Sequence, residues 1–318
     1  MKINFIGNYS NGLNGEVADE THLTRSLEEL GHEVIRVPRD VWKAFVDGYA
    51  PNDDWVLPEK ADINIICKWG AFDKASYIMK LRELSGAKVI YWTWDYMGWP
   101  NPPQWHKVIA MASDRHLTNE GGVIDMMLNH GIRAQYFPFD VADEKIPVFD
   151  AEEQEYGVVF FGGYFHAGHR VDWIKRINQT IPVTIFSVDF EKWKAAGIEK
   201  AFPPVYGEEF NRRVAESKIC LQFSVNDDCW GYWSNRVGKT LLAGGFLLAH
   251  YTPGMELFLH DGAAYFRTVY DAIEKIKFYL DRPIARKKIQ EKGANIGRSH
   301  FTSGQRCSDL ITVINNVL

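Results

Sequence analysis

The amino-acid sequence predicts an α/β protein made of two Rossmann-like domains, each built around a parallel β-sheet. Its 318 residues exceed what one hydrophobic core usually holds and suit two domains of about 150 residues each. Apolar strand-like runs alternate with helical patterns along both halves, which is typical of βαβ units. Residues 142–156 are acidic and show no periodicity, so we expect a linker there.

In the first half, the expected strands and helices alternate from the first residues onward. Leu23, Leu27 and Leu30 are spaced as on one face of a helix, and Gly31 is expected to end that helix. The predicted strands are residues 2–8, 32–38, 62–68, 88–94, a further strand with its loop at 108–119, and 134–140. The predicted helices are residues 20–31, 74–86 and 121–131.

The same alternation restarts after the linker. The predicted strands are residues 157–163, 182–188, 219–224 and 245–250, and the predicted helices are residues 169–178, 207–218, 234–243, 269–281 and 283–300. We therefore predict domains at 1–145 and 155–300, with a C-terminal helix at 301–318 that packs back on the first domain.

Composition is that of a soluble globular protein, with 46% hydrophobic and 24% charged residues. No apolar run approaches the roughly 20 residues of a membrane helix, and residues 1–9 lack the features of a signal peptide. The four cysteines form no C-x-x-C pair, which favours reduced thiols over disulfides or zinc. These features predict a cytoplasmic protein.

The net charge of −5 is unevenly distributed. Residues 1–150 contain 15 basic and 22 acidic side chains, whereas the remainder contains 21 basic and 19 acidic ones. This balance disfavours a broad surface for nucleic acid or anionic lipid, although a local basic groove stays open. Many of the 11 tryptophans fall in predicted loops, where they either stack on a sugar or base or fill a cleft between domains.

Residues 234–245, "SNRVGKTLLAGG", contain the letters of a phosphate loop but not its spacing. The motif G-x-x-x-x-G-K-[ST] requires a glycine at position 233, which is tryptophan, so an NTPase is disfavoured. No G-x-G-x-x-G follows the first strand of either half, which disfavours an NAD enzyme.

Several ordered segments resemble the C-terminal domain of GT-B glycosyltransferases, in particular the CgeB-like (spore-maturation type) group with its group-1-type C-terminal domain. The matching segments are "FFGGYFHAGHR", "PPVYGEEFNRRVAESKICLQFS", "SNRVGKTLLAGGFLLAHYTPGMELFLHDGAAYF", "AIEKIKFYLDRP" and "SHFTSGQR". The resemblance covers residues 155–310 well and the first half weakly. It implies a GT-B fold with two sheets facing a central cleft, an acceptor-side domain at 1–145 and a nucleotide-sugar donor domain at 155–300.

A sugar-nucleotide diphosphate is an anion, for which helix N-termini and guanidinium groups are suitable partners. We expect Ser234 or Asn235 to cap a helix with Arg236 in its first turn, facing the diphosphate; the alternative is an exposed arginine on a solvated helix start. Gly162 and Gly163 would let the backbone approach the ligand and Arg170 would clamp a phosphate, unless this is a plain tight turn with a surface arginine. Three further residues complete the expected donor-binding set: Lys239, Thr240 and Glu256.

On the acceptor side, "GNYSNGLNGE" resembles the loop that GT-B enzymes place against the reacting sugar, which points to Gly12 and Asn14. Asp95 follows a predicted strand, and His116 and Asn119 fall just after the next predicted strand, where α/β sheets place their ligands. Asp95 and His116 are therefore candidate catalytic groups for an acceptor hydroxyl, with a loop cap or a core hydrogen bond as the alternative. Trp94 and Trp99 are candidate acceptor contacts.

The resemblance implies transfer of a hexose-like sugar from a nucleotide-diphosphate sugar, UDP most readily, with retention of configuration. No D-x-D motif occurs, so no metal and no cofactor beyond the sugar nucleotide are expected. Related retaining enzymes carry two glutamates where this chain has Gly231 and Lys239. A lysine cannot accept hydrogen bonds as a carboxylate does, so a non-catalytic nucleotide-sugar or glycan-binding protein is the alternative. The expected acceptor is a glycan, a protein or a small molecule, with a hydroxymethylated DNA base as a minority option; the oligomeric state is left open.

Overall fold

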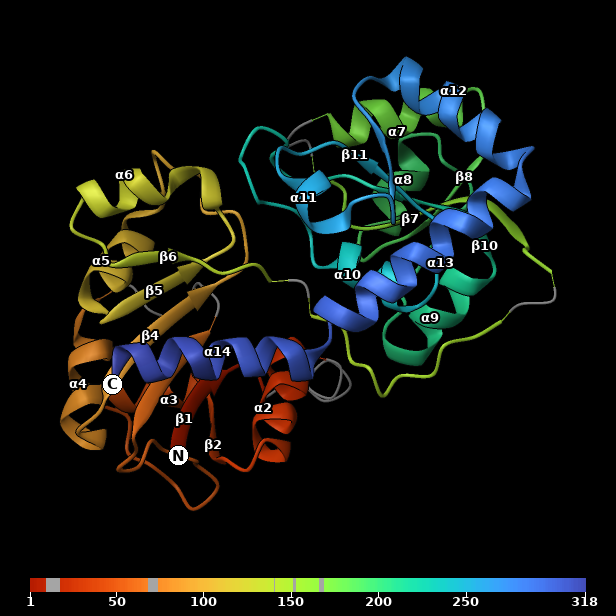
Figure 1. Ribbon diagram of the computed structural model, residues 1–318. Coiled ribbons are helices and arrows are strands. Elements are labelled where there is room, and N and C mark those ends of the chain that lie inside the picture. The colour runs from red at the N-terminus through yellow and green to blue at the C-terminus, as the bar shows by residue number, and fades with distance from the viewer. Residues whose placement is uncertain (10–17, 68–73, 140, 151–152, 166–168) are drawn as a thin grey trace. The chain divides into compact units, whose positions relative to one another are not determined.

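The computed structural model describes residues 1–318 except 10–17, 68–73, 140, 151–152 and 166–168. The chain forms two compact units, the first comprising residues 1–139 and 303–318 and the second comprising residues 140–302. Each unit has one six-stranded sheet with helices on both of its faces (Figure 1).

The first unit has the strand order β2-β1-β3-β4-β5-β6, and its paired strands are parallel. The strands are β1 (Lys2–Gly7), β2 (Glu33–Pro38), β3 (Ile63–Cys67), β4 (Lys88–Thr93), β5 (Arg115–Thr118) and β6 (Ala134–Tyr136). The helices are α2 (Asp19–Glu29), α3 (Arg39–Val46), α4 (Ser76–Ser85), α5 (Gln104–Ala112), the 3₁₀ turn η1 (Gly121–Val123), α6 (Ile124–Asn129) and α14 (Ser303–Val317).

The second unit has the strand order β12-β11-β10-β7-β8-β9, again with parallel pairs. The strands are β7 (Tyr156–Phe161), β8 (Val183–Phe186), β9 (Ala201–Phe202), β10 (Ser217–Gln222), β11 (Leu247–His250) and β12 (Ala264–Phe266). The helices are α7 (Arg170–Asn178), α8 (Phe190–Ala195), α9 (Gly207–Ala215), α10 (Arg236–Leu242), α11 (Met255–Leu259), α12 (Val269–Leu280) and α13 (Pro283–His300).

Burial on both faces explains why the central strands are mostly apolar. Every residue of β3 is buried, as expected for a parallel strand covered by helices on each side. A polar pair in this core is internally satisfied, because the Asn4 side-chain amide donates to Asn64 Oδ1 at 2.9 Å. Burial of apolar surface thus holds each sheet between its helices, at about 25 cal/mol per Å².

The C-terminal helix α14 belongs to the first unit, although it follows the whole second unit in the sequence. Ser303 Oγ and Ser26 Oγ are 2.9 Å apart, and Cys307 Sγ donates to the Leu23 carbonyl at 3.2 Å. These contacts join α14 to α2, so the last residues of the chain complete the first unit.

The structure corrects the strand predicted at residues 108–119. Residues 108–112 belong to α5, and only residues 115–118 form a strand. The apolar letters of this segment come from a helix that buries His106, Ile109 and Ala110 against the sheet. Five short elements were not predicted, because their apolar runs are too brief to show a period: α3, α8, β9, α11 and β12.

Two glycines of α13 bring that helix unusually close to its neighbours. A Cβ atom at Gly293 would lie 2.5 Å from the Gly262 carbonyl oxygen, and one at Gly297 would lie 2.8 Å from the Leu242 backbone nitrogen in α10. Real Cβ contacts are not this short, so only glycine permits the observed approach. The position of α10 therefore depends on glycines about 50 residues further along the chain.

Candidate functional site

The second sheet reverses its strand order between β7 and β10. The chain runs from β7 outward through β8 to β9 and then returns to β10 on the other side of β7. In open α/β sheets, ligands bind at the carboxyl ends of the strands where this reversal occurs. Helix α7 follows β7 and begins at Arg170, and α10 follows β10 and begins at Arg236, so both arginines lie at this switch point.

Arg170 is buried, with 2% of its surface exposed. Its Nη2 donates to the Phe223 carbonyl at 2.9 Å, its guanidinium lies 5.7 Å from the ring centres of Phe160 and Phe165, and its Nε is buried without a hydrogen-bond partner. Burial, and then the neighbouring positive charge of Arg236, lower the pKa of Arg170 to about 10. Within the described residues no carboxylate pairs with Arg170.

Arg170 and Arg236 are both positively charged, and no carboxylate in the described residues pairs with the buried Arg170. This arrangement raises the free energy of the folded protein. An anion placed between them would remove that penalty and supply the missing acceptor. The alternative of a surface arginine at position 170 is thus excluded, because the side chain is buried. The expected role of Arg170 as a phosphate clamp stays a prediction.

The start of α10 differs in detail from the expected cap. Asn235 occupies the N-cap position, but its side chain makes no capping hydrogen bond; its Oδ1 instead accepts from the Val141 backbone N–H at 2.7 Å. Ser234 Oγ accepts from the Arg236 backbone N–H at 3.4 Å and from Arg236 Nη1 at 3.0 Å. Ser234 therefore orients the guanidinium, and Asn235 holds the chain segment that enters the second unit.

The glycine pair after β7 makes room for side chains of this chain. A Cβ at Gly162 would lie 2.6 Å from the Phe160 ring, and one at Gly163 would lie 2.5 Å from the Phe165 ring. The Phe160 and Phe165 rings also flank the Arg170 guanidinium. The glycines thus allow the aromatic packing around Arg170, which is a different role from the predicted backbone approach to a ligand.

The remaining predicted donor-binding residues lie at different depths. Lys239 is half-buried on α10, and Glu256 is exposed on α11. Thr240 is buried, and its Cγ2 would lie 2.9 Å from a Cβ at Gly245, so it packs beneath the turn that ends α10. Thr240 therefore contributes to packing rather than to an open site.

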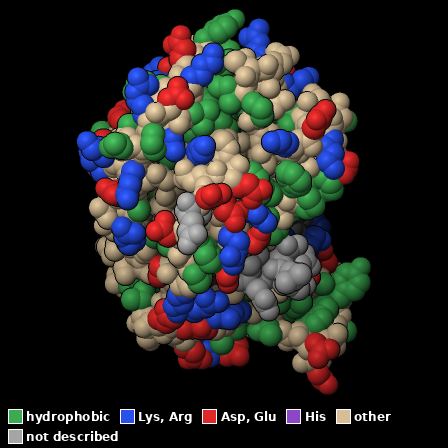
Figure 2. Space-filling view, turned by 90° about the vertical axis from the view of Figure 1, so that its right-hand side faces the viewer, with side chains coloured by type: hydrophobic (Ala, Val, Ile, Leu, Met, Phe, Trp, Pro, Cys, Tyr) green, Lys and Arg blue, Asp and Glu red, His purple; other side chains and the backbone are tan. Residues whose placement is uncertain are grey.

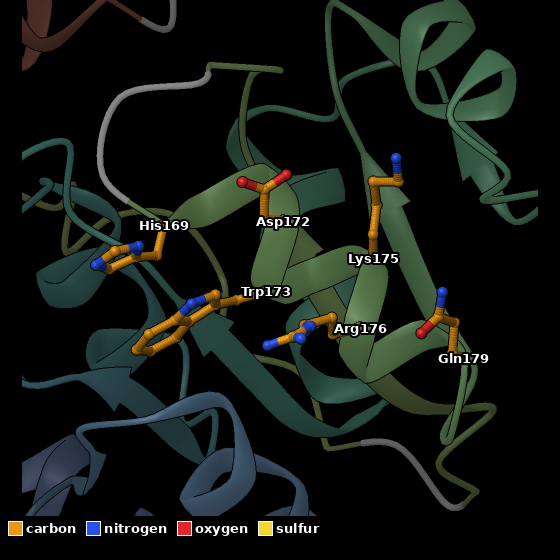
Figure 3. A pocket seen from close by; sticks show the side chains of 6 residues that line it. All are labelled: His169, Asp172, Trp173, Lys175, Arg176 and Gln179. Atoms are coloured by element: carbon orange, nitrogen blue, oxygen red, sulfur yellow. The ribbon is translucent and has the colours of Figure 1, made fainter.

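A pocket of about 420 Å³ lies along α7 and begins at His169, the residue before Arg170 (Figure 3). His169 stacks on Trp173 with ring centres 4.8 Å apart, and both point to the same side of the helix. The side chains that line the pocket are His169, Asp172, Trp173, Lys175, Arg176 and Gln179. Its lining comes from His169 and helix α7 and includes neither Arg170 nor Arg236.

In the first unit, Asp95 follows β4 and is half-buried. Asn119 and Glu120 follow β5, and the Asn119 amide donates to the Trp94 carbonyl at 2.8 Å. Glu120 is fully buried, and burial raises its pKa to about 7 although backbone N–H groups at Met97, Gly98 and Trp99 act in the opposite direction. Glu120 is not among the candidates predicted from the sequence. Its position shortly after a strand is the feature of the sequence that could have indicated it.

The predicted acceptor contacts Trp94 and Trp99 are packing residues of the first unit. Trp94 is 7% exposed and stacks on Phe139 with ring centres 4.0 Å apart. Trp99 is 5% exposed, and its Nε1 donates to His106 Nε2 at 3.4 Å. Buried rings cannot serve as platforms for a base or sugar without rearrangement. Gly12 and Asn14 lie outside the described residues.

His116 does not follow a strand, because it lies within β5 and is fully buried. Its ring stacks on Tyr91 at 5.0 Å and lies 5.1 Å from the His106 ring, and its Nδ1 is 3.2 Å from the Tyr91 carbonyl oxygen. Burial lowers the pKa of His116 to about 4. The structure therefore places His116 in the core, and the prediction that it lies at a ligand edge is wrong.

This burial predicts a specific pH dependence of stability. A histidine whose pKa is lower in the folded than in the unfolded protein binds fewer protons when folded, so stability falls as the pH falls below about 6.5. When the pH is lowered from 6.5 to 4, the free energy of unfolding should fall in the wild type by roughly 2–3 kcal/mol more than in His116→Phe. Urea titrations at several pH values measure this; Glu120 acts in the opposite direction but is common to both proteins. Parallel pH profiles would contradict a neutral buried His116.

In the described part of the chain, no three His, Cys, Asp or Glu side chains converge to hold a metal ion. None of the helices described is both long and apolar enough to cross a membrane.

Comparisons with known proteins agree with this architecture. Residues 170–312 match the family described as glycosyl transferase-like, and a search of curated proteins finds no match. Sucrose-phosphate synthase from Thermosynechococcus elongatus has a TM-score of 0.70 and 9% identity, over 100% of this chain and 99% of that chain. An alpha-glucosyltransferase in complex with UDP and a DNA containing an HMU base has a TM-score of 0.66 and 13% identity, over 99% of both chains. HepE from Anabaena in complex with UDP and glucose has a TM-score of 0.65 and 12% identity, over 99% of this chain and 100% of that chain.

The protein therefore has the GT-B fold, with two parallel six-stranded sheets and interleaved helices. The family match on residues 170–312 supports a glycosyltransferase of this fold. The match lies in the unit that contains the arginine pair.

Proposed function

We propose that the protein transfers a sugar from a nucleotide-diphosphate sugar, UDP-linked most readily, to an acceptor hydroxyl. The proposal includes retention of configuration, no metal and no further cofactor, and membership of the CgeB-like group. It also includes a cytoplasmic location and a glycan, protein or small-molecule acceptor.

The observation that carries the proposal is the buried Arg170 beside Arg236. A site with two guanidinium groups, in which no carboxylate among the described residues pairs with the buried one, suits an anion with two or more charges, such as a diphosphate. Each guanidinium can present parallel N–H donors to phosphate oxygens, which fixes the ligand's orientation as well as its charge. The switch-point location and the family match on residues 170–312 support the same reading.

Related structures favour a uridine nucleotide. The Anabaena HepE structures contain UDP and UDP-glucose, and the alpha-glucosyltransferase structure contains UDP. The latter also contains DNA, which keeps a hydroxymethylated base as a minority acceptor. Basic and acidic side chains are interspersed on the face seen in Figure 2, which offers no broad basic surface for a DNA backbone there.

In the proposed reaction, the bond between the sugar's anomeric carbon and the β-phosphate oxygen breaks, and a bond to the acceptor oxygen forms. Negative charge then grows on the leaving diphosphate, where Arg170 and Arg236 stabilise it. The acceptor hydroxyl gives up its proton, for which Asp95 is the candidate base. The arginines thus act on the donor and the carboxylate on the acceptor.

A non-catalytic nucleotide-sugar binding protein is the second candidate. It is favoured by Lys239 and Gly231, which stand where related retaining enzymes carry glutamates. Lysine can donate to a ribose oxygen or a phosphate, but it cannot accept a hydrogen bond from a ribose hydroxyl.

A calorimetric titration with UDP, GDP, ADP and TDP, followed by mass-spectrometric detection of donor hydrolysis, tests both candidates. We expect UDP to bind with a Kd in the micromolar range, about −8 kcal/mol, and UDP-sugar to be hydrolysed slowly.

We expect Lys239→Glu to change nucleotide affinity or selectivity about tenfold, because it reverses the charge at the expected ribose position. Absence of binding to all four nucleotides contradicts the proposal, binding without turnover on any acceptor favours the second candidate, and an unchanged Lys239→Glu profile removes Lys239 from the ribose.

A further inference from the structure

Two consecutive residues after β5 hold the loop that follows the neighbouring strand β4. Asn119 Nδ2 donates to the Trp94 carbonyl at 2.8 Å, and Glu120 Oε2 accepts from the Met97 backbone N–H at 3.0 Å. The N–H groups of Gly98 and Trp99 also point to the Glu120 carboxylate. The loop is therefore fixed on both sides of Asp95, which lies between Trp94 and Met97 in the chain.

Both residues of this pair are buried, with 3% of Asn119 and 0% of Glu120 exposed. A buried carboxylate is unfavourable unless hydrogen bonds satisfy it, and here the donors come from one short loop. Glu120 is itself held in place, because its backbone N–H donates to Thr118 Oγ1 at 3.2 Å at the end of β5. Strands β4 and β5 are paired from Ile90 to Thr93. The residues that follow β5 therefore hold the loop that follows β4 in a fixed position relative to the sheet.

We propose that Asn119 and Glu120 are positioning residues that clamp the 94–99 loop and thereby set the location of Asp95 for the proposed sugar transfer. The inference rests on the proposed function for its chemical consequence, but the clamp itself is a property of the first unit. A general base must lie within hydrogen-bond reach of the proton that it takes, and a displacement of about 1 Å reduces the rate about 100-fold.

Glu120→Gln is the principal variant, because it keeps the size of the side chain and leaves one carbonyl acceptor for the loop N–H groups. Asp125→Asn is the matched control, since it removes an exposed carboxylate from the neighbouring helix α6. Hydrogen exchange followed by mass spectrometry is expected to accelerate at least about tenfold in residues 94–99 of Glu120→Gln and to stay unchanged in Asp125→Asn. Unchanged exchange in residues 94–99 would overturn the clamp.

The second measurement follows UDP-glucose hydrolysis in Glu120→Gln, Asp95→Asn and the double variant. If Glu120 acts through Asp95, kcat should fall in both single variants and no further in the double variant, whereas UDP affinity stays unchanged. Losses that multiply in the double variant, or a full rate in Glu120→Gln, would overturn the positioning role. A wild type that binds no nucleotide would contradict the proposed function instead, and the exchange comparison would then decide the clamp alone.

Discussion

Replacing Arg170 by methionine is expected to weaken UDP binding by about 100-fold or more without destabilising the protein. In the proposed function, the loss follows from removing a buried guanidinium that would donate charge-assisted hydrogen bonds to phosphate, each contributing about 1.5–3 kcal/mol. Stability should be equal or higher, because a buried positive charge beside Arg236 is removed. The Phe223 carbonyl keeps a donor, since Gln222 Nε2 also lies 3.2 Å from it.

Isothermal calorimetry with UDP and urea denaturation without ligand measure the two halves of this prediction. Arg298→Met is the matched control, because Arg298 is exposed on α13 and bonds to Asn295 of its own helix. The control should bind UDP as the wild type does. A methionine variant that keeps its UDP affinity would show that Arg170 does not hold the diphosphate. A strongly destabilised one would show that the buried charge is compensated in the folded protein.

Gly297→Ala is expected to lower the free energy of unfolding of the second unit by about 1–3 kcal/mol, although alanine favours helices by about 1 kcal/mol over glycine. The added Cβ would lie 2.8 Å from the Leu242 backbone nitrogen and 3.1 Å from the Leu241 carbonyl carbon. Backbone atoms of a packed helix cannot yield as a side chain can, so α10 and α13 must move apart. Because Arg236 begins α10, UDP affinity should fall together with stability.

Urea denaturation and UDP titration of the same samples measure this coupling. Ser299→Ala provides the control, as it adds helix propensity at an exposed position of α13 and should leave both quantities nearly unchanged. Normal stability in Gly297→Ala would mean that the two helices have room to separate. Lower stability with unchanged UDP affinity would mean that the position of α10 does not matter to the ligand.

Local patterns explain why the fold was predictable and several side-chain roles were not. The βαβ alternation and the capping Gly31, whose φ is +85°, are set by residues close in sequence, and the structure confirms them. Residues 108–112 were mistaken for a strand because a short apolar run has the same letters in either state. The glycine spacing of Gly293 and Gly297 was visible in the sequence, but the helix packed against them was not.

The sequence by itself determined the class of fold, the two halves and the segment "SNRVGKTLLAGG" as a helix after a strand, because these depend on the period of apolar residues and on turn chemistry. Only the tertiary structure decided which polar groups meet. Arg170 and Arg236 are 66 residues apart in the chain, yet the positive charge of Arg236 contributes to the lowered pKa of Arg170. His116 and Asp95 looked alike as candidates, but one is buried within β5 and the other lies in a clamped loop. Burial and through-space proximity determine the pKa of a side chain, and the local sequence predicts neither the burial nor the proximity.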